Sequence, residues 1–261
     1  SYIYLGAALL AAGNIFFEFA SVNYNAMLVQ VSTPKTVGRV SGFGWGMGYI
    51  GGIVLLIILL VLFIQNFGSE TGNGLLNVPF GSEGGALDVR FAILASAAWF
   101  AIFAIPVLVS VPEIPAGARE NRVSFFGSYA KLFGTIKTLA KKSPQVLMFL
   151  LASAVFRDGL AAVFTFGAII AAQVFGFSPS EVIYFAVAAN LVAGIGTFIG
   201  GWVDDTFGAK HVIIGSLIGL VAAGLAVLFI GDAKTGFWIA GLFLTLFVGP
   251  LQAASPSFLA R

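Results

Sequence analysis

Hydrophobic residues in this chain form long, nearly uninterrupted runs, and polar residues are concentrated in the segments between them. A run of about 20 apolar residues crosses the ~30 Å hydrocarbon core of a bilayer as a helix. These runs are apolar on every face, whereas barrel strands alternate, so the predicted fold class is all-α, a polytopic membrane helix bundle. Seven spans are predicted, near residues 3–29, 43–64, 91–111, 146–172, 182–203, 212–230 and 237–254.

The composition also favours lipid as the solvent. The chain has 261 residues, of which 59% are hydrophobic and 9% are charged, and its mean hydropathy is +1.01. Soluble domains have about 25% charged residues. The 13 basic residues are spread over several connections, which argues against a nucleic-acid partner. The absence of Cys excludes disulfides and zinc–thiolate sites, and we expect neither a cofactor nor a metal.

The basic residues predict the orientation of the spans. If the spans alternate in direction, one side of the membrane receives only Arg90 and Lys234. By the positive-inside rule the other side is cytoplasmic, with Ser1 outside and Arg261 inside. The cytoplasmic side receives 10 of the 13 basic residues: Lys35, Arg39, Arg119, Arg122, Lys131, Lys137, Lys141, Lys142, Lys210 and Arg261.

The longest cytoplasmic connection, 112–145, is predicted to contain an amphipathic helix on the membrane surface. Its apolar residues recur at helical spacing opposite four lysines. They are Phe125, Phe126, Tyr129, Leu132, Phe133, Ile136 and Leu139. The chain would then divide into three spans (1–111), a linker (112–145) and four spans (146–261). The alternative is a solvated basic loop.

The charged stretch 200–210 lies between two apolar runs and contains Gly201, Asp204, Asp205, Gly208 and Lys210. An acidic residue that ends one span, a Gly at the reversal and a Lys that opens the next span form a clip that neighbouring helices can share. The stretch resembles the signature loop of the major facilitator superfamily, although Thr206 replaces the usual Arg or Lys.

A closer resemblance runs along nearly the whole chain. The segments 23–28, 37–46, 48–52, 156–159 and 249–252 are similar to the vacuolar effluxer-like branch of that superfamily, named for a fungal autophagy-related amino-acid exporter. In that branch an Arg is expected after Ser255, where this chain has Pro256. The resemblance implies twelve helices in two halves, of which this chain would lack the first three and the last two. It also implies amino-acid export, and we expect the plasma membrane of a prokaryote rather than a vacuole.

Glu18 lies in the middle of the first span, where a charged carboxylate costs about 2.5–3.5 kcal/mol. Asn14, Ser21 and Asn25 share its helix face, so this polar stripe is a candidate for the solute path. In the alternative interpretation Glu18 is protonated and hydrogen-bonds a neighbouring helix.

Arg157 and Asp158 are adjacent within a span and point about 100° apart, so each needs its own partner. Arg157 lies ~20 Å along the helix from Pro144. It is a candidate to bind a solute carboxylate through its planar fork. Asp158 is a candidate for proton coupling, since low dielectric favours the protonated carboxyl group. The alternative is a structural ion pair with Glu18 or another span.

Five further candidates are small or neutral. Gly44, Gly48 and Gly52 are spaced four residues apart and predict a bare helix face for close packing. Asn190 and Gln252 are polar groups in spans that could touch a solute.

The predicted function is a secondary active transporter that moves a small polar solute by alternating access, coupled to a proton or another cation. No phosphate-binding loop is present, so nucleotide hydrolysis is not expected to drive it. The alternatives are a channel or a structural helix bundle and, less favoured with no Cys and one His, an intramembrane enzyme. We expect a monomer in lipid.

Overall fold

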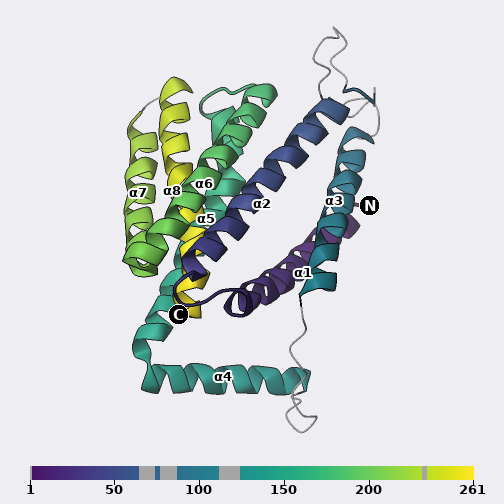
Figure 1. The fold of residues 1–261 in the computed structure, drawn as a ribbon. Coiled ribbons are helices and arrows are strands. Elements are labelled where there is room, and N and C mark those ends of the chain that lie inside the picture. The colour runs from purple at the N-terminus through teal and green to yellow at the C-terminus, as the bar shows by residue number, and fades with distance from the viewer. Residues whose placement is uncertain (1, 65–73, 77–86, 112–123, 231–233) are drawn as a thin grey trace. The chain divides into compact units, whose positions relative to one another are not determined.

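The structure is a computed structural model that describes residues 2–64, 74–76, 87–111, 124–230 and 234–261 (Figure 1). These residues form helices and no strand, so the predicted all-α class is confirmed. The helices are α1 (Tyr2–Val31), α2 (Val37–Leu59), η1 (Leu60–Ile64), α3 (Leu87–Ser110), α4 (Phe125–Lys142), α5 (Pro144–Gln173), α6 (Pro179–Phe207), α7 (Ala209–Phe229) and α8 (Lys234–Ala260).

In the described part of the chain, seven helices are long and apolar enough to cross a bilayer, which confirms the seven predicted spans. Several extend beyond their apolar runs. The helix expected to begin at residue 43 begins at Val37, and the last helix continues to Ala260 through Pro250 and Pro256. Prolines are tolerated inside membrane helices because neighbouring groups satisfy the backbone carbonyls that they leave unpaired.

The chain divides into two compact units by its internal contacts: Ser1–Val54 with Phe166–Arg261, and Leu55–Thr165. The predicted division at residues 112 and 145 stays a prediction. In the first unit α6, α7 and α8 pack alongside one another (Figure 1). Helices α6 and α8 run in the same direction, because their N-termini meet through Glu181 and Lys234 and their C-terminal ends meet through Asp204 and Arg261.

An aromatic cluster joins the N-terminal ends of α6 and α8. We define it by Phe175, Phe177, Phe185, Phe237 and Trp238, whose ring centroids are 4.5–6.2 Å apart in the contacting pairs. The pairs include edge-to-face geometries, which the quadrupoles of aromatic rings favour. Beside the cluster, the ammonium group of Lys234 lies 3.0 Å from a carboxylate oxygen of Glu181. It also lies 5.6 Å from the ring centroid of Phe177.

The second unit contains the predicted amphipathic helix, α4. Ser124 caps its N-terminus by accepting a hydrogen bond of 3.2 Å from the backbone N–H of Gly127. Ser143 alone separates α4 from α5, which starts at Pro144. The helix prediction is therefore confirmed over 125–142, and the predicted linker residues 112–123 lie outside the described residues.

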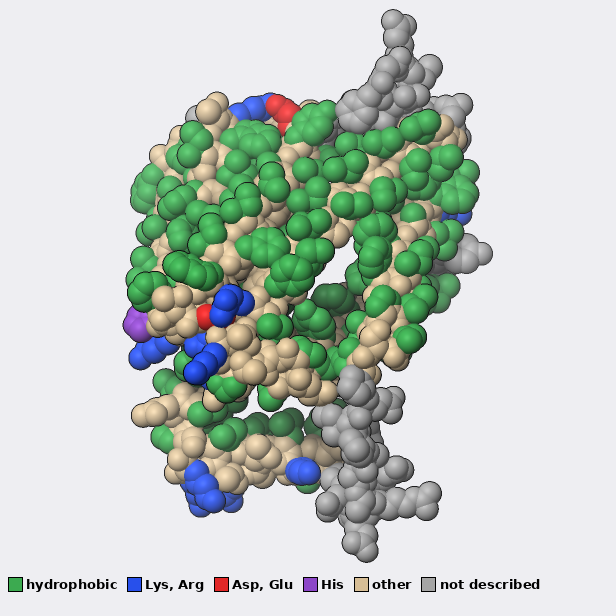
Figure 2. All heavy atoms as spheres, viewed as in Figure 1, with side chains coloured by type: hydrophobic (Ala, Val, Ile, Leu, Met, Phe, Trp, Pro, Cys, Tyr) green, Lys and Arg blue, Asp and Glu red, His purple; other side chains and the backbone are tan. Residues whose placement is uncertain are grey.

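The surface of the helices is strongly apolar. Figure 2 shows hydrophobic side chains along the visible length of the helices, with charged side chains gathered at their ends. Large residues such as Leu108, Ile218 and Leu228 are exposed. Patches of this size on a soluble protein would promote aggregation, so a bilayer is the solvent that this surface fits.

Candidate functional site

The charged stretch at the end of α6 is helical rather than a loop, which corrects the sequence prediction. Asp204 and Asp205 lie in the last turn of α6, and Gly208 alone separates α6 from α7. Gly208 has φ +90°, a conformation that residues with a Cβ rarely adopt. The reversal of the chain thus occurs at the predicted glycine, and the two carboxylates belong to the helix before it.

Asp205 caps a helix that is distant in sequence. Its Oδ1 accepts a hydrogen bond from the Gly38 N–H at 2.8 Å, and its Oδ2 accepts from the Arg39 N–H at 3.0 Å. These N–H groups belong to the first turn of α2 and have no partner within that helix. The side chain is 6% exposed and places a negative charge where the macrodipole of α2 is positive.

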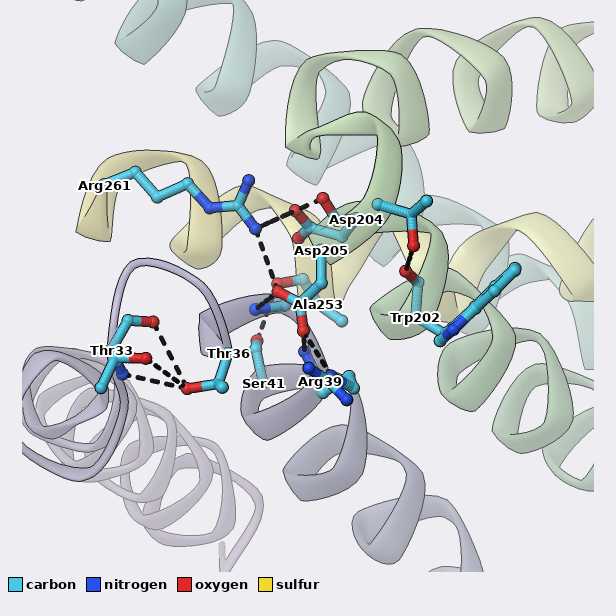
Figure 3. A network of polar contacts seen from close by, with 11 residues as sticks. Thr33, Thr36, Arg39, Ser41, Trp202, Asp204, Asp205, Ala253 and Arg261 are labelled. Carbon is cyan, nitrogen blue, oxygen red and sulfur yellow. Dashed lines mark hydrogen bonds and ion pairs between the residues drawn. The ribbon is translucent and has the colours of Figure 1, made fainter.

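Two arginines complete this carboxylate cluster, which we define by Arg39, Asp204, Asp205 and Arg261 (Figure 3). Arg39 Nε lies 2.9 Å from Asp205 Oδ2, with the Arg39 side chain 60% exposed. Arg261 Nη2 lies 2.8 Å from Asp204 Oδ1 and 3.1 Å from Asp205 Oδ1. It also donates to the backbone carbonyl of Asp204 at 3.3 Å. The cluster connects the start of α2 with the ends of α6 and α8.

Arg261 offsets an unfavourable arrangement in α6. Two carboxylates in the last turn of a helix oppose its macrodipole, and Asp204 is only 1% exposed. A guanidinium group at that end is favourable to both the dipole and the carboxylates. The guanidinium group of Arg261, at the C-terminal end of α8, therefore compensates negative charge at the C-terminal end of α6.

Next to this cluster, the backbones of α2 and α6 make a close contact at glycines. A Cβ on Gly42 would lie 2.9 Å from both Gly201 Cα and the Thr197 carbonyl oxygen. A Cβ on Gly201 would lie 2.7 Å from the Gly38 carbonyl oxygen. Such distances are shorter than van der Waals contact, so only glycine allows the helices to approach this closely.

The α2 glycines in this contact differ from the predicted ones. Gly38, Gly42 and Gly46 face α6, with the Phe198 ring against Gly46. Of the predicted stripe, Gly44 lies against the Tyr24 hydroxyl, a Cβ on Gly52 would lie 4.0 Å from Asn190 Oδ1, and a Cβ on Gly48 would meet no described atom within 4 Å. The α2–α6 contact therefore uses Gly38, Gly42 and Gly46, a series that alternates with the predicted one at the same spacing, and the predicted stripe stays a prediction.

Two hydrogen bonds continue the contact of α2 with α8. The buried Ser41 hydroxyl donates to the Ala253 carbonyl at 2.7 Å. About two turns further along α2, the Tyr49 hydroxyl donates to Gln252 Oε1 at 2.7 Å. Tyr49 lies about 18 Å from the start of α2 at 1.5 Å per residue, which is near the middle of a ~30 Å span. Gln252, a sequence candidate, thus contacts another helix at membrane depth.

The other sequence candidates do not meet at one place among the described residues. Glu18 is exposed on α1. Asn14, Asn25 and Asn190 each donate to the carbonyl four residues earlier in their own helix, at 3.1, 2.9 and 2.7 Å. Arg157 and Asp158 are exposed on α5, and the described ion pairs include neither of them.

Lys210, a predicted member of the clip, is exposed and belongs to none of the ion pairs between described residues. Thr206 bonds only the Trp202 carbonyl of its own helix, at 2.9 Å. Arg39, Arg261 and Tyr49 are the site residues that sequence reasoning did not select. The signal for the arginines was present, since both lie on the predicted cytoplasmic side. In the described ranges, no three His, Asp or Glu side chains come together as metal ligands would.

Seven long apolar helices, three of which (α2, α6 and α8) are joined at their ends by ion pairs, define a multi-pass α-helical integral membrane protein. A family model described as "Vacuole effluxer Atg22 like" matches residues 1–261. The chain belongs to this family, which confirms the resemblance found in the sequence. No solved structure matches the chain.

The relatives are bacterial and fungal. An uncharacterized MFS-type transporter, YxiO, of Bacillus subtilis is 27% identical over 250 residues, which cover 95% of this chain and 54% of the relative. Autophagy-related protein 22 of Yarrowia lipolytica is 25% identical over 260 residues, which cover 91% of this chain and 39% of that relative. Autophagy-related protein 22-1 of Aspergillus niger is 22% identical over 192 residues, which cover 70% of this chain and 29% of that relative. The chain therefore spans about half the length of the Bacillus relative and less of the fungal ones.

Proposed function

We propose that the protein to which this chain belongs is a secondary active transporter and that the carboxylate cluster is its cytoplasmic gate. The observation that carries the proposal is the cap that Asp205 of α6 makes on α2, across 166 residues of sequence from Arg39. The contact joins a helix that precedes the amphipathic α4 to helices that follow it. These are the two halves that the sequence predicts to rock against each other.

The gate is built from contacts that water can replace. When α2 moves away from α6 at a membrane surface, water can bond the N–H groups of Gly38 and Arg39 and the Asp205 carboxylate. Because protein–water bonds replace the lost ones, each hydrogen bond to the Asp205 carboxylate contributes only about 1.5–3 kcal/mol net. The two bonds that cap α2 therefore give closed and open states that differ by a few kcal/mol, the range in which a ligand can shift the populations.

The solute path lies deeper in the membrane than the gate in this proposal. Tyr49 and Gln252 are hydrogen-bonded between α2 and α8, and a solute with amide-like or hydroxyl groups can exchange for that bond. Glu18, Asn14, Asn25 and Asn190 add further polar groups at membrane depth. An ionisable group within a membrane helix is a functional candidate by default, because burying it is costly.

In this proposal Arg157 binds the solute, and Asp158 binds and releases the coupled proton. Arg157 presents a charged planar fork suited to a carboxylate, which fits amino acids as solutes. Asp158 exchanges a proton as the two states interconvert. The proposed direction is export, driven by a proton or another cation, from a monomer in the plasma membrane of a prokaryote, with Arg261 in the cytoplasm.

The test uses the complete protein, purified into proteoliposomes and assayed for counterflow with a panel of radiolabelled amino acids. We expect saturable counterflow of at least one of them. Asp158→Asn should abolish its dependence on a pH gradient, and Arg157→Lys should weaken solute affinity because Lys keeps the charge but lacks the fork. Flux that neither saturates nor shows counterflow would indicate a channel, and chemical change of the solute would indicate an enzyme.

A further inference from the structure

Helix α4 carries two kinds of side chain on opposite sides. At about 100° per residue, Leu132, Phe133 and Ile136 fall within one arc of the helix, together with Leu139. Lysines occupy the remaining surface, and the segment Phe125–Lys142 contains no Asp or Glu. They are Lys131, Lys137, Lys141 and Lys142. The helix is therefore amphipathic and purely cationic.

Within the described ranges, large residues on the apolar side of α4 are left exposed. Leu132, Phe133 and Ile136 are 53%, 67% and 39% exposed. Large apolar residues grouped on one helix face indicate a surface that is covered by something other than water. None of the ion pairs between described residues involves a lysine of α4, so the four cations are also available to a partner.

The path of the chain fits a helix that lies in the plane of the membrane. Only Ser143 lies between α4 and the spanning helix α5, and Figure 1 shows α4 crosswise to α5. In Figure 2 the blue side chains of α4 lie on its edge away from α5, and green side chains lie on the edge from which α5 rises. With α5 across a bilayer, this arrangement would turn the apolar side of α4 toward the hydrocarbon and leave the lysines at headgroup level.

We propose that α4 is a docking surface for an anionic lipid leaflet. Leu132, Phe133 and Ile136 enter the boundary between headgroups and acyl chains, and the lysines bind phosphate groups of anionic lipids. Charge complementarity selects this occupant, because four cations without a single acid fit a negatively charged surface. A lysine near such a surface contributes on the order of a fivefold change in binding. This inference is independent of the proposed transport activity, because it concerns α4 alone.

The experiment measures where α4 lies in the complete protein. The chain has no Cys, so single-cysteine variants carry one spin label each once any cysteine elsewhere in the complete protein has been replaced. Phe133→Cys reports the apolar side and Thr138→Cys the opposite side. Each protein is placed in nanodiscs of phosphatidylcholine with an increasing share of phosphatidylglycerol. We expect the label at 133 to gain oxygen collisions and lose contact with a water-soluble nickel chelate as phosphatidylglycerol increases, while the label at 138 stays accessible to nickel.

A matched pair of double variants tests the role of the lysines. Lys137→Gln with Lys142→Gln removes one cation on each side of the apolar arc. It should lower the ratio of docked to undocked populations by on the order of fivefold per lysine. Lys35→Gln with Lys210→Gln removes the same net charge from exposed positions outside α4 and should leave the ratio unchanged.

Three results would overturn the proposal. A label at 133 that stays accessible to nickel in every lipid mixture would show that α4 does not dock. Docking that is equal with and without phosphatidylglycerol, or an equal effect of both double variants, would remove the role of the α4 lysines. A label shielded from both oxygen and nickel would show that protein, not lipid, covers this side.

Discussion

The two ends of α6 and α8 are joined by different physical means. At the C-terminal ends, the carboxylate cluster consists of ion pairs and hydrogen bonds, and it includes α2. At the N-terminal ends, the aromatic cluster consists mainly of ring contacts within the segment 175–238, supported by the pair of Glu181 and Lys234. Both ends contain acidic and basic groups, but among the described residues only the carboxylate cluster includes residues of α2.

The difference indicates which contact can open. Charged groups at a membrane surface can exchange their partners for water at low net cost. Water cannot replace the contacts of packed rings in this way, because it does not restore their dispersion contacts or their apolar surroundings. In our account α6 and α8 therefore stay together at the aromatic cluster, while α2 leaves them at the carboxylate cluster. Four substitutions test this contrast.

Asp205→Ala should have the largest effect, because it removes the cap on α2 and an acceptor for two arginines. Breaking a buried charge pair costs about 3–5 kcal/mol, and we expect ~3 kcal/mol because Arg39 is largely exposed. With Ser41→Cys as a reporter on the buried face of α2, alkylation by a water-soluble maleimide should accelerate tenfold or more. Thr206→Ala is the control, since that hydroxyl bonds only its own helix. Equal rates in both backgrounds would refute the gate.

Phe237→Ala should come next, at about 3 kcal/mol for the loss of a buried ring. We expect a lower melting temperature of the detergent-solubilised protein, with the same alkylation rate at residue 41. Phe229→Ala truncates an exposed ring and serves as the control. Faster alkylation at residue 41 would mean that the aromatic cluster also holds α2, which would contradict the contrast.

Gly42→Ala should cost about 1–3 kcal/mol, because its methyl group meets the backbone of Gly201 and Thr197 at 2.9 Å. The expected result is a shift toward the open state, read from faster alkylation at residue 41. Gly48→Ala is a matched control on the same helix, with open space where its methyl group would lie. If both alanine variants behave alike, the glycine contact does not hold the gate closed.

Lys234→Met should have the smallest effect. Ion pairs between exposed side chains contribute little to stability, and both Lys234 and Glu181 are partly exposed. The melting temperature should change far less than in Phe237→Ala. A comparable decrease would show that the ion pair, rather than the packing of rings, holds the N-terminal ends together.

Hydropathy was sufficient to predict the fold class and the number of spans, because a bilayer selects apolar runs of fixed length. The same criterion misplaced the helix ends. Asp204 and Asp205 mark the end of an apolar run, yet the helix continues to Phe207, since charged residues are compatible with a helix once it has left the hydrocarbon. Similarly, the last span was predicted to end near residue 254, whereas α8 continues through Pro256 to Ala260.

The partners of the two carboxylates could not be read from the sequence. Lys210 was the nearest basic residue in the chain, whereas Arg39 lies 166 residues from Asp205 and approaches it only because α2 packs on α6. The glycines that contact α6 could not be identified for the same reason, since Gly42 and Gly44 belong to series of equal spacing. Gln252 was selected as a polar group in a span that could touch a solute, and that role stays a prediction. Its hydrogen-bond partner Tyr49 was not selected, because tyrosine is common at membrane interfaces.

The most direct test measures two distances in the same protein. Spin labels on Met47→Cys and Ile199→Cys report α2 against α6, and labels on Tyr184→Cys and Ile239→Cys report α6 against α8. Double electron–electron resonance of the complete protein in nanodiscs should give two α2–α6 distances, with Asp205→Asn favouring the longer one, and one unchanged α6–α8 distance. A single α2–α6 distance that Asp205→Asn does not alter, or equal broadening of both pairs, would contradict the account.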